Sequence, residues 1–443
     1  MRIKLSDHFT YKRLLRFTIP SIIMMIFMSV YGIVDGIFVS NFAGKEAFTA
    51  LNFIYPVIMI FSSVGFMFGS GGSALISKIF GEGNKEKANK IFSMVVYISL
   101  IVGILLGLIG ILFIKSIAKL LGAEGLLLEN CVIYAIPLLV ALPVNILQLE
   151  FQTFFSTAEK PTMGLICTIF AGVLNIILDA LLVGLLKCGL LGASIATAFS
   201  QLVGGLFPII YFMRKNSSIL KIGKSTFDIK ALLKICANGS SELLSNVAMS
   251  IVGLLYNVQL LRYAGEDGVA AYGILMYISF FFNAIFIGFS IGTAPVISYH
   301  YGAKNENELK SLLKKCINIT LITSISMFIL SEVFSPVFSK IFVGYDEYLY
   351  EMTIRGFLIF SFAFLFMGFV IFFSSFFTAL NDGLTSAIIS FVRTLIFQIG
   401  FVIVLPLLFD LDGIWLSVVV TELCAVITSV IFLICKRKKY KYF

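Results

Sequence analysis

The chain has 443 residues, of which 59% are hydrophobic and only 13% are charged, and its formal net charge at pH 7 is +9. Soluble globular domains carry roughly 25% charged residues, so this composition excludes a soluble globular domain. It predicts an all-α polytopic membrane protein. The positive charge alone would suit nucleic acid or a membrane surface. Its placement along the chain favours the membrane and argues against a nucleic-acid partner.

The first apolar run, Ile19–Phe42, contains a single charged residue, Asp35. About 20 apolar residues cross the hydrocarbon core of a bilayer, so this run is long enough to be a membrane helix. Met1–Arg16 is basic, but no small-residue cleavage pattern follows the run, and we expect no cleavable signal peptide. A carboxyl group inside a membrane helix is costly and is typical of a functional site.

Eleven further apolar runs follow the first, and only helices satisfy their backbone groups in lipid. The predicted membrane helices cover residues 14–39, 52–79, 91–114, 129–154, 162–186, 191–213, 231–262, 269–300, 311–336, 349–379, 385–409 and 413–435.

Lysine and arginine predict the orientation. If the N-terminus is cytoplasmic, 25 of the 33 basic residues fall in cytoplasmic segments. Such an excess is the usual signature of cytoplasmic loops, so we expect both termini inside the cell and the basic residues at the inner leaflet.

The chain contains an internal repeat. FAGKEAFTALN at Phe42–Asn52 matches YAGEDGVAAYG at Tyr263–Gly273, an offset of 221 residues. The same offset brings Gly81 onto Gly302 and Asn84 onto Asn305. Each half holds six predicted helices, an even number, so both halves start on the same side and the repeat is parallel.

The repeat predicts two parallel six-helix lobes around a central cleft, the architecture of an alternating-access transporter. Duplication for packing alone is the alternative interpretation, and we weigh it lower. The predicted domains are an N-terminal lobe at residues 1–215, a cytoplasmic loop at 216–230 and a C-terminal lobe at 231–443.

Helix rise places two acids of the first lobe at a similar depth. Asp35 lies ten residues before Lys45, about 15 Å from the outer boundary, and Asp179 lies eight residues before Lys187, about 12 Å from it. Tyr31 precedes Asp35 by one helical turn, Asn175 precedes Asp179 in the same way, and Thr197 falls at a similar level.

This group suits a proton or a cation. Two carboxylates in a low-dielectric cavity do not both ionise cheaply, so H⁺ or Na⁺ would relieve their repulsion, and oxygen ligands suit a hard cation such as Na⁺. The alternative is that the polar groups only join helices, which membrane proteins also do. Because intramembrane acids are costly, we favour the functional interpretation for Asp35 and Asp179.

The second lobe lacks this pair, because the repeat places Tyr256 opposite Asp35. Instead, three charged residues fall near the middle of its helices: Glu242, Arg393 and Glu422. We expect Arg393 to pair with one glutamate, and the cluster is either structural or a substrate contact. Three further charges lie near helix ends and are expected to reach toward loops or the membrane surface: Glu150, Glu332 and Arg355.

Motifs for soluble-type enzymes are missing from the sequence. There is no Walker A sequence, nucleophile elbow, HExxH or glycine-rich dinucleotide fingerprint, and the seven cysteines and two histidines form no ligand cluster. We therefore expect no enzyme activity, no organic cofactor, no disulfide framework and no transition-metal site.

The chain resembles the multidrug and toxic compound extrusion (MATE) family. The segments that carry the resemblance are VDGIFVSNFAGKEAFTALN after Tyr31, GSGGSALISKIFGEGNKEKA at the end of the second run, NIILDALLVGLLKCGLLGASIATAFSQ and the C-terminal GIWLSVVVTE. In order and spacing they cover essentially the whole chain. By its short length and its termini, the chain is closer to the bacterial multidrug-export type than to the plant or animal type.

The resemblance implies an inner-membrane antiporter that exports organic, mostly cationic, drugs against inward H⁺ or Na⁺ flow. Because a six-plus-six transporter can function as a monomer, we expect a monomer. The resemblance also implies that Tyr31, Asp35, Asn175, Asp179 and Thr197 form the ion-binding network, while other branches of the family use second-lobe acids where Glu242 stands. A flippase for a lipid-linked oligosaccharide precursor is the alternative function. Such a protein would be expected to have a more cationic interior than this chain.

Overall fold

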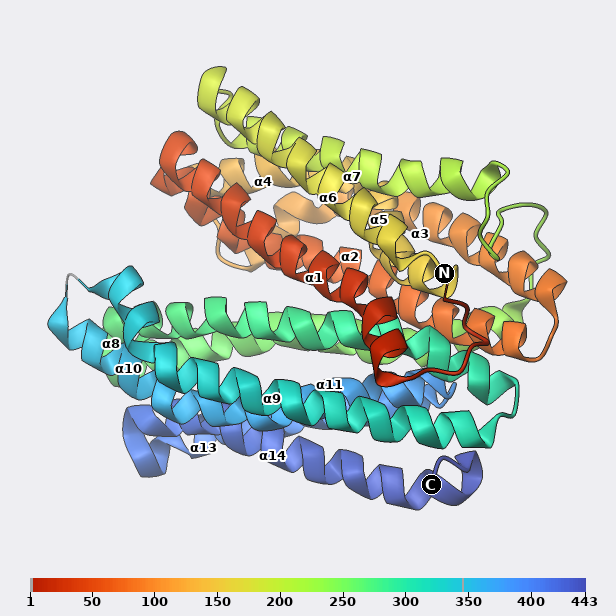
Figure 1. Cartoon of the computed structure of the whole chain (residues 1–443). Helices are drawn as coiled ribbons and strands as arrows, with labels where there is room; N and C mark the ends of the chain where they lie inside the picture. The colour runs from red at the N-terminus through yellow and green to blue at the C-terminus, as the bar shows by residue number, and fades with distance from the viewer. Residues whose placement is uncertain (1–2, 345) are drawn as a thin grey trace.

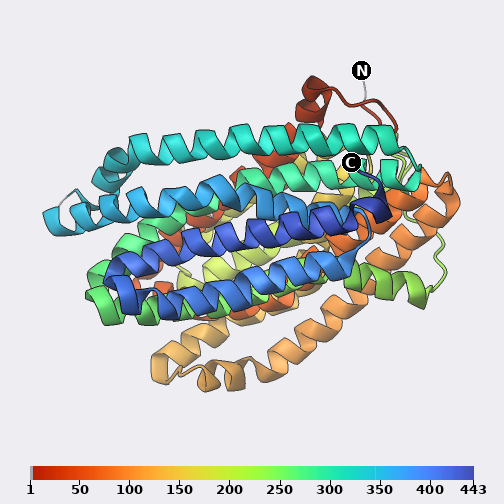
Figure 2. The ribbon, with the colours of Figure 1, turned by 90° about the horizontal axis from the view of Figure 1, so that it is seen from below.

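A computed structural model of the chain describes residues 3–344 and 346–443. Every regular element among these residues is a helix, and the helices run lengthwise beside one another (Figure 1 and Figure 2). They form two halves, and both ends of the chain lie at the same end of the molecule. We refer to this end as the termini end.

The first half begins at α1 and ends at α7. It consists of α1 (Tyr11–Phe38), the π-helical turn η1 (Val39–Ala43), α2 (Lys45–Gly81), α3 (Lys85–Leu120), α4 (Gly125–Val140), α5 (Leu142–Thr157), α6 (Pro161–Asp179), the π-helical turn η2 (Ala180–Leu185) and α7 (Gly189–Met213).

The second half begins at α8 after an extended connection. It consists of α8 (Ile229–Gly302), α9 (Glu306–Val343), α10 (Glu347–Phe360), the 3₁₀ turn η3 (Ser361–Ala363), α11 (Phe364–Ala379), α12 (Gly383–Phe391), the π-helical turn η4 (Val392–Gln398), α13 (Ile399–Val404) and α14 (Pro406–Tyr440).

The described residues contain twelve membrane spans. Ten helical runs are long and apolar enough to cross a membrane, and the pair α4 and α5, bent by 61°, forms one more. The run α8 is broken at Gly265, whose φ of 63° is a conformation that glycine adopts readily, so α8 holds two spans. This total confirms the predicted number of helices and the all-α membrane fold.

Matching turns connect the second and third spans of each half. Asn84 caps α3 by accepting a hydrogen bond from the N–H of Lys87 at 3.0 Å, and Asn305 caps α9 in the same way from Glu308 at 3.1 Å. The residue directly before each capping asparagine has a positive φ; it is Gly83 in the first half and Lys304 in the second. The 221-residue repeat is therefore present in backbone geometry as well as in sequence.

The two halves meet symmetrically near the termini end. A Cβ on Gly81 of α2 would collide with the backbone oxygen of Tyr299 on α8, and a Cβ on Gly302 would collide with the backbone oxygen of Lys78. Lys78 and Tyr299 are themselves repeat counterparts, so the two contacts are related by a twofold-like rotation. This relation confirms the predicted pair of parallel lobes.

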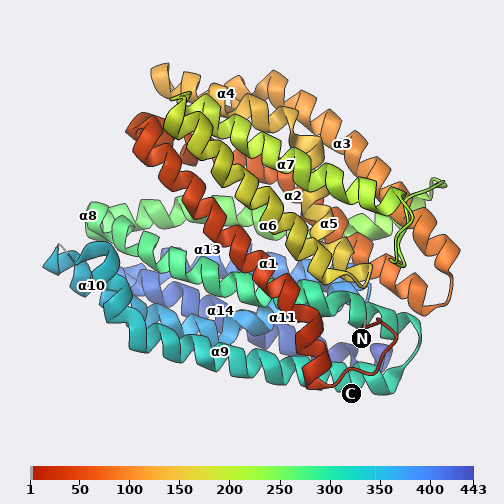
Figure 3. The ribbon, with the colours of Figure 1, turned by 45° about the horizontal axis from the view of Figure 1, so that its top comes forward.

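The lobes separate toward the opposite end. In Figure 1 and Figure 3 the first half slants away from the second, and the ribbons come together only near the termini. Hydrogen bonds between the lobes follow this pattern, since the Ser298 hydroxyl and the Asn381 amide both donate to the backbone oxygen of Ala74, close to the end of α2.

Helix α1 belongs to both lobes. Toward its far end, Tyr31 packs against Gly172 of α6, within the first lobe. Near its start, Thr18 packs against Gly292 of α8, and the buried residues Phe9 and Leu14 join the core of the second lobe. The helix therefore crosses from one lobe to the other along its length (Figure 3).

Candidate functional site

The structure brings Asp35 of α1 and Asp179 of α6 together in the first lobe. Their carboxyl groups are close enough for their charges to interact, but no hydrogen bond joins them in the described structure. Gly172, two turns before Asp179, makes this approach possible, because any side chain there would collide with Phe27 and Tyr31 of α1. A glycine on α6 thus sets the spacing between the two helices that carry the acids.

The acid pair lacks hydrogen-bond donors. Asp179 is fully buried, and neither of its carboxylate oxygens has a partner among the described residues; the same holds for Oδ1 of Asp35. A buried carboxylate without partners is costly, and two adjacent ones also repel each other. One proton shared by the pair, or a bound cation, would supply the missing interaction.

The three neutral residues that the sequence placed beside the acids lie in the same region. The amide of Asn175, which is buried, donates to the Thr197 hydroxyl of α7 at 3.4 Å, while its Oδ1 has no partner within the described chain. Tyr31 lies beside Asp35. The five predicted side chains therefore lie on α1, α6 and α7 in the same part of the first lobe.

Two tyrosines that the sequence analysis missed complete this surrounding. Tyr55 of α2 lies beside Asp35 and Tyr31, and Tyr134 of α4 lies beside both acids. Tyr55 is ten residues into α2 and Tyr134 nine residues into α4, so helix rise puts both about 14–15 Å from the far end, the depth of Asp35. Helix rise could have given their depth from the sequence, but not which side of α2 and α4 faces the acids.

Each acid is followed by a π-helical turn. η1 begins four residues after Asp35, and η2 begins directly after Asp179. Such turns are rare and occur frequently at functional sites, because they widen the helix and free backbone groups. Apolar patterning gave no sign of either turn, since a single inserted residue hardly alters an apolar run.

The charged cluster of the second lobe forms an ion pair. Arg393, within the π-helical turn η4, donates through Nε at 3.0 Å and through a terminal nitrogen at 2.6 Å to Oε1 of Glu422 on α14. Glu242 of α8 lies near Arg393. The second carboxylate oxygen of Glu422 is buried and has no partner in the described structure.

An aromatic stack occupies the second-lobe position that matches Asp35. Tyr256 stacks on Tyr272 with ring centroids 5.1 Å apart, and Tyr272 stacks on Trp415 at 6.2 Å. The Tyr256 hydroxyl is 2.8 Å from the Ser417 hydroxyl. The second lobe therefore fills with packed rings the place where the first lobe holds an acid.

The prediction for Glu150 was wrong. Instead of reaching toward a loop, its side chain is fully buried within α5, and neither carboxylate oxygen has a partner among the described residues. Gly65 and Gly69 let α2 pack directly on α5, which leaves the side chain no route to the surface. Arg355 does face outward and pairs with Asp412, whereas Glu332 accepts a hydrogen bond from Ser361.

A family model for MatE matches the chain at residues 20–181 and 243–404, one match in each lobe. The multidrug export protein MepA of Staphylococcus saprophyticus is 27% identical over 436 residues, covering 95% of this chain and 93% of the relative. MepA of Staphylococcus haemolyticus is 28% identical over 426 residues, covering 94% and 91%.

Solved structures show the same fold. A MATE protein in complex with MaL6 superposes with a TM-score of 0.93 at 24% identity, covering 98% of each chain. The outward-facing conformation of a multidrug resistance MATE family transporter of the MOP superfamily gives 0.92 at 23% identity, again over 98% of each chain. With the family model matched in both lobes, the chain belongs to the MatE family of multi-pass membrane proteins.

Proposed function

We propose that this protein is a multidrug efflux antiporter that exports organic, mostly cationic, compounds in exchange for inward H⁺ or Na⁺. The observation that carries the proposal is the acid pair of the first lobe. Asp179 is fully buried, and both of its carboxylate oxygens and Oδ1 of Asp35 lack partners among the described residues. The names of its relatives, multidrug export protein MepA, support drugs as the cargo.

The proposed orientation has both termini in the cytoplasm and the protein in the plasma or inner membrane, acting as a monomer. Basic residues concentrated at the termini end support it, because cytoplasmic segments are enriched in lysine and arginine. With this orientation the lobes meet at the cytoplasmic end and diverge outward. The moving units are residues 1–215 and 231–443, joined by the loop at 216–230.

Coupling requires that ion and drug favour different arrangements of the lobes or compete for one. Asp35 and Asp179 hold the proton or Na⁺, and Tyr31, Asn175 and Thr197 complete its surroundings. Because α1 carries Asp35 and packs on both lobes, a change at the acid pair reaches the contact between them. Binding of the ion from outside would thereby release the drug outward.

The charges inside the spans support a cationic cargo. We weigh four acids against one basic residue, Arg393, which is already paired. The four acids are Asp35, Asp179, Glu242 and Glu422. A surplus of acids attracts cations and disfavours phosphate. This is why we rank drug export above the flippase, and the role of Glu242, Arg393 and Glu422 as substrate contact or structural pair stays a prediction.

The test is dye efflux from vesicles that contain only the purified protein, with a pH gradient and a Na⁺ gradient imposed separately. We expect a cationic dye to move against its gradient under one of the two ions, which names the coupling ion. Failure under both gradients, together with rescue of a cell that lacks a lipid-precursor flippase, would replace the proposal with that alternative.

A further inference from the structure

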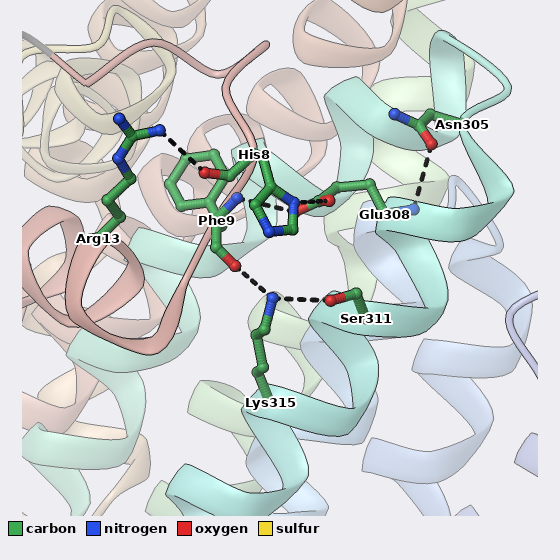
Figure 4. A network of polar contacts seen from close by, with 7 residues as sticks. All are labelled: His8, Phe9, Arg13, Asn305, Glu308, Ser311 and Lys315. Carbon is green, nitrogen blue, oxygen red and sulfur yellow. Dashed lines mark hydrogen bonds and ion pairs between the residues drawn. The ribbon is translucent and has the colours of Figure 1, made fainter.

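The segment before α1, Ile3–Thr10, is bound to both lobes. The backbone N–H of Leu5 donates to Oε1 of Glu159 at 2.9 Å, in the turn between α5 and α6 of the first lobe. The backbone N–H of Phe9 donates to Oε1 of Glu308 at 2.9 Å, on α9 of the second lobe (Figure 4). The stretch from Leu5 to Phe9, which begins with a turn, therefore bridges the two lobes at the termini end.

Glu308 is the centre of the attachment to the second lobe. It is nearly buried, its Oε2 lies 2.6 Å from Nδ1 of His8, and its own backbone N–H is capped by Asn305. Lys315, two turns along α9, donates to the backbone oxygen of Phe9 and to the Ser311 hydroxyl (Figure 4). Both backbone groups of Phe9 are thus held by charged side chains, which form the stronger class of hydrogen bonds.

Apolar contacts support the same attachment. The side chains of Leu5 and Phe9 are fully buried although they precede the first membrane helix. The Phe9 ring makes edge contacts with Phe17 and with His300 of α8, at centroid distances of 6.0 and 6.4 Å. These contacts fix the segment on the second lobe, so that its hydrogen bond to Glu159 joins that lobe to the first.

We infer that Ile3–Thr10 is a clasp that holds the lobes together at the cytoplasmic end, through Glu159 on one lobe and Glu308 on the other. The inference rests on the alternating-access cycle of the proposed function, in which that end must open. Because the two anchors lie on different lobes, opening separates the clasp from one of them. Glu159 and Glu308 therefore set how readily the cytoplasmic end opens.

The experiment measures lobe separation directly, by electron–electron resonance between spin labels. In a background without the seven native cysteines, labels at Lys85→Cys and Lys310→Cys report the termini end, and labels at Glu46→Cys and Asp267→Cys report the far end. All four positions are exposed, with one of each pair on either lobe. Spectra are recorded in lipid nanodiscs.

Glu308→Ala and Glu159→Ala each remove one anchor, and the milder Glu308→Gln keeps the volume of the side chain. Glu308→Ala removes the two contacts of Glu308 with His8 and Phe9, and Glu159→Ala removes the hydrogen bond from Leu5. Each loss is expected to raise the open-to-closed ratio at the termini end, about tenfold or more for Glu308→Ala. Glu306→Ala is the matched control, because Glu306 binds Lys441 at 2.8 Å entirely within the second lobe. It should leave both distance distributions unchanged.

If wild type shows two distances at the termini end and no anchor variant shifts their ratio, the clasp is overturned while the transport cycle stands. If wild type shows one distance under every ion and dye condition, the cycle itself fails and the clasp with it. A second variant, His8→Cys with Glu308→Cys, joins the clasp to α9 by a short reducible cross-linker. Combined with Glu159→Cys and Leu5→Cys, it should stop dye efflux until reductant is added.

Discussion

At the scale of single residues, Asp35 and Asp179 have unfavourable surroundings. They lie on neighbouring helices with unpartnered oxygens, and two tyrosines and an amide are close by. The groups that interact with them include no arginine or lysine. In the proposed function, a proton or a cation balances the pair, which thereby switches between two charge states.

Asp35→Asn should abolish gradient-driven dye efflux while leaving expression and thermal unfolding close to wild type. An amide keeps the size of the carboxyl group but neither ionises nor binds a cation as a carboxylate does, so the exchange for H⁺ or Na⁺ is lost. Dye efflux in vesicles measures the effect. Asp267→Asn, an exposed acid at the far end of the molecule, is the control and should transport normally.

Asp382, in the turn between α11 and α12, should make stability depend on pH. Burial alone would raise its pKa, but interactions with Tyr440, Thr385 and Lys436 outweigh burial and lower the pKa below the ordinary value. A lowered folded-state pKa contributes stability above the unfolded pKa of about 4, and this contribution is lost as pH falls through the folded-state value.

Thermal unfolding in detergent between pH 6 and 3 tests this assignment. On acidification, the melting temperature of wild type should fall further than that of Asp382→Asn, because the asparagine side chain does not titrate. Equal losses in the two proteins would mean that Asp382 contributes nothing to the acid sensitivity.

At the scale of secondary-structure elements, one π-helical turn follows each of the two acids, and a third contains Arg393. In the second lobe, η4 carries Arg393 toward Glu422 of α14, so that the ion pair joins two helices inside the lobe. Breaking a buried pair on one side leaves an uncompensated charge, which costs far more than losing an exposed pair.

Glu422→Gln should destabilise the protein by about 3 kcal/mol, because Arg393 stays largely buried without its partner. Asp412→Asn breaks the pair with Arg355, whose side chain is 70% exposed, and should cost less than about 1 kcal/mol. Chemical unfolding in mixed micelles compares the two variants. Similar losses would show that the Arg393 pair is no more protected from solvent than the surface pair.

At the scale of the whole molecule, glycines set the distance between the lobes at the termini end. Gly81 and Gly302 occupy equivalent places on α2 and α8, each directly against backbone of the opposite lobe. Because the obstacle is backbone rather than a movable side chain, a methyl group at either position forces the lobes apart.

Gly81→Ala and Gly302→Ala should therefore have similar effects, as the twofold-like relation requires. Overpacking costs about 1–3 kcal/mol, which would shift the lobes toward separation at the termini end by roughly 5- to 150-fold. The spin-label pair on α3 and α9 measures the shift. Gly273→Ala is the control, because Gly273 is a helical glycine with open space around it. A clear difference between Gly81→Ala and Gly302→Ala would contradict the symmetric contact.

The sequence by itself determined the twelve spans, the parallel repeat and the depth of the acids. Hydrophobic length, the 221-residue offset and helix rise are properties of the chain that need no knowledge of neighbours. Matched depth predicted only that Asp35 and Asp179 could meet. Only the tertiary structure decided which way each helix face turns, because that depends on the side chains and glycines of adjacent helices.

Rotation and packing explain what the sequence could not predict. Tyr55 and Tyr134 share the depth of the acids, but only the arrangement of α2 and α4 turns them inward. Glu150 is buried because two glycines of α2 let that helix pack directly on α5. The segment Ile3–Thr10 crosses to the second lobe because Glu308 and Lys315, about 300 residues away in sequence, hold its backbone there. Such long-range contacts exist only once the two lobes have met.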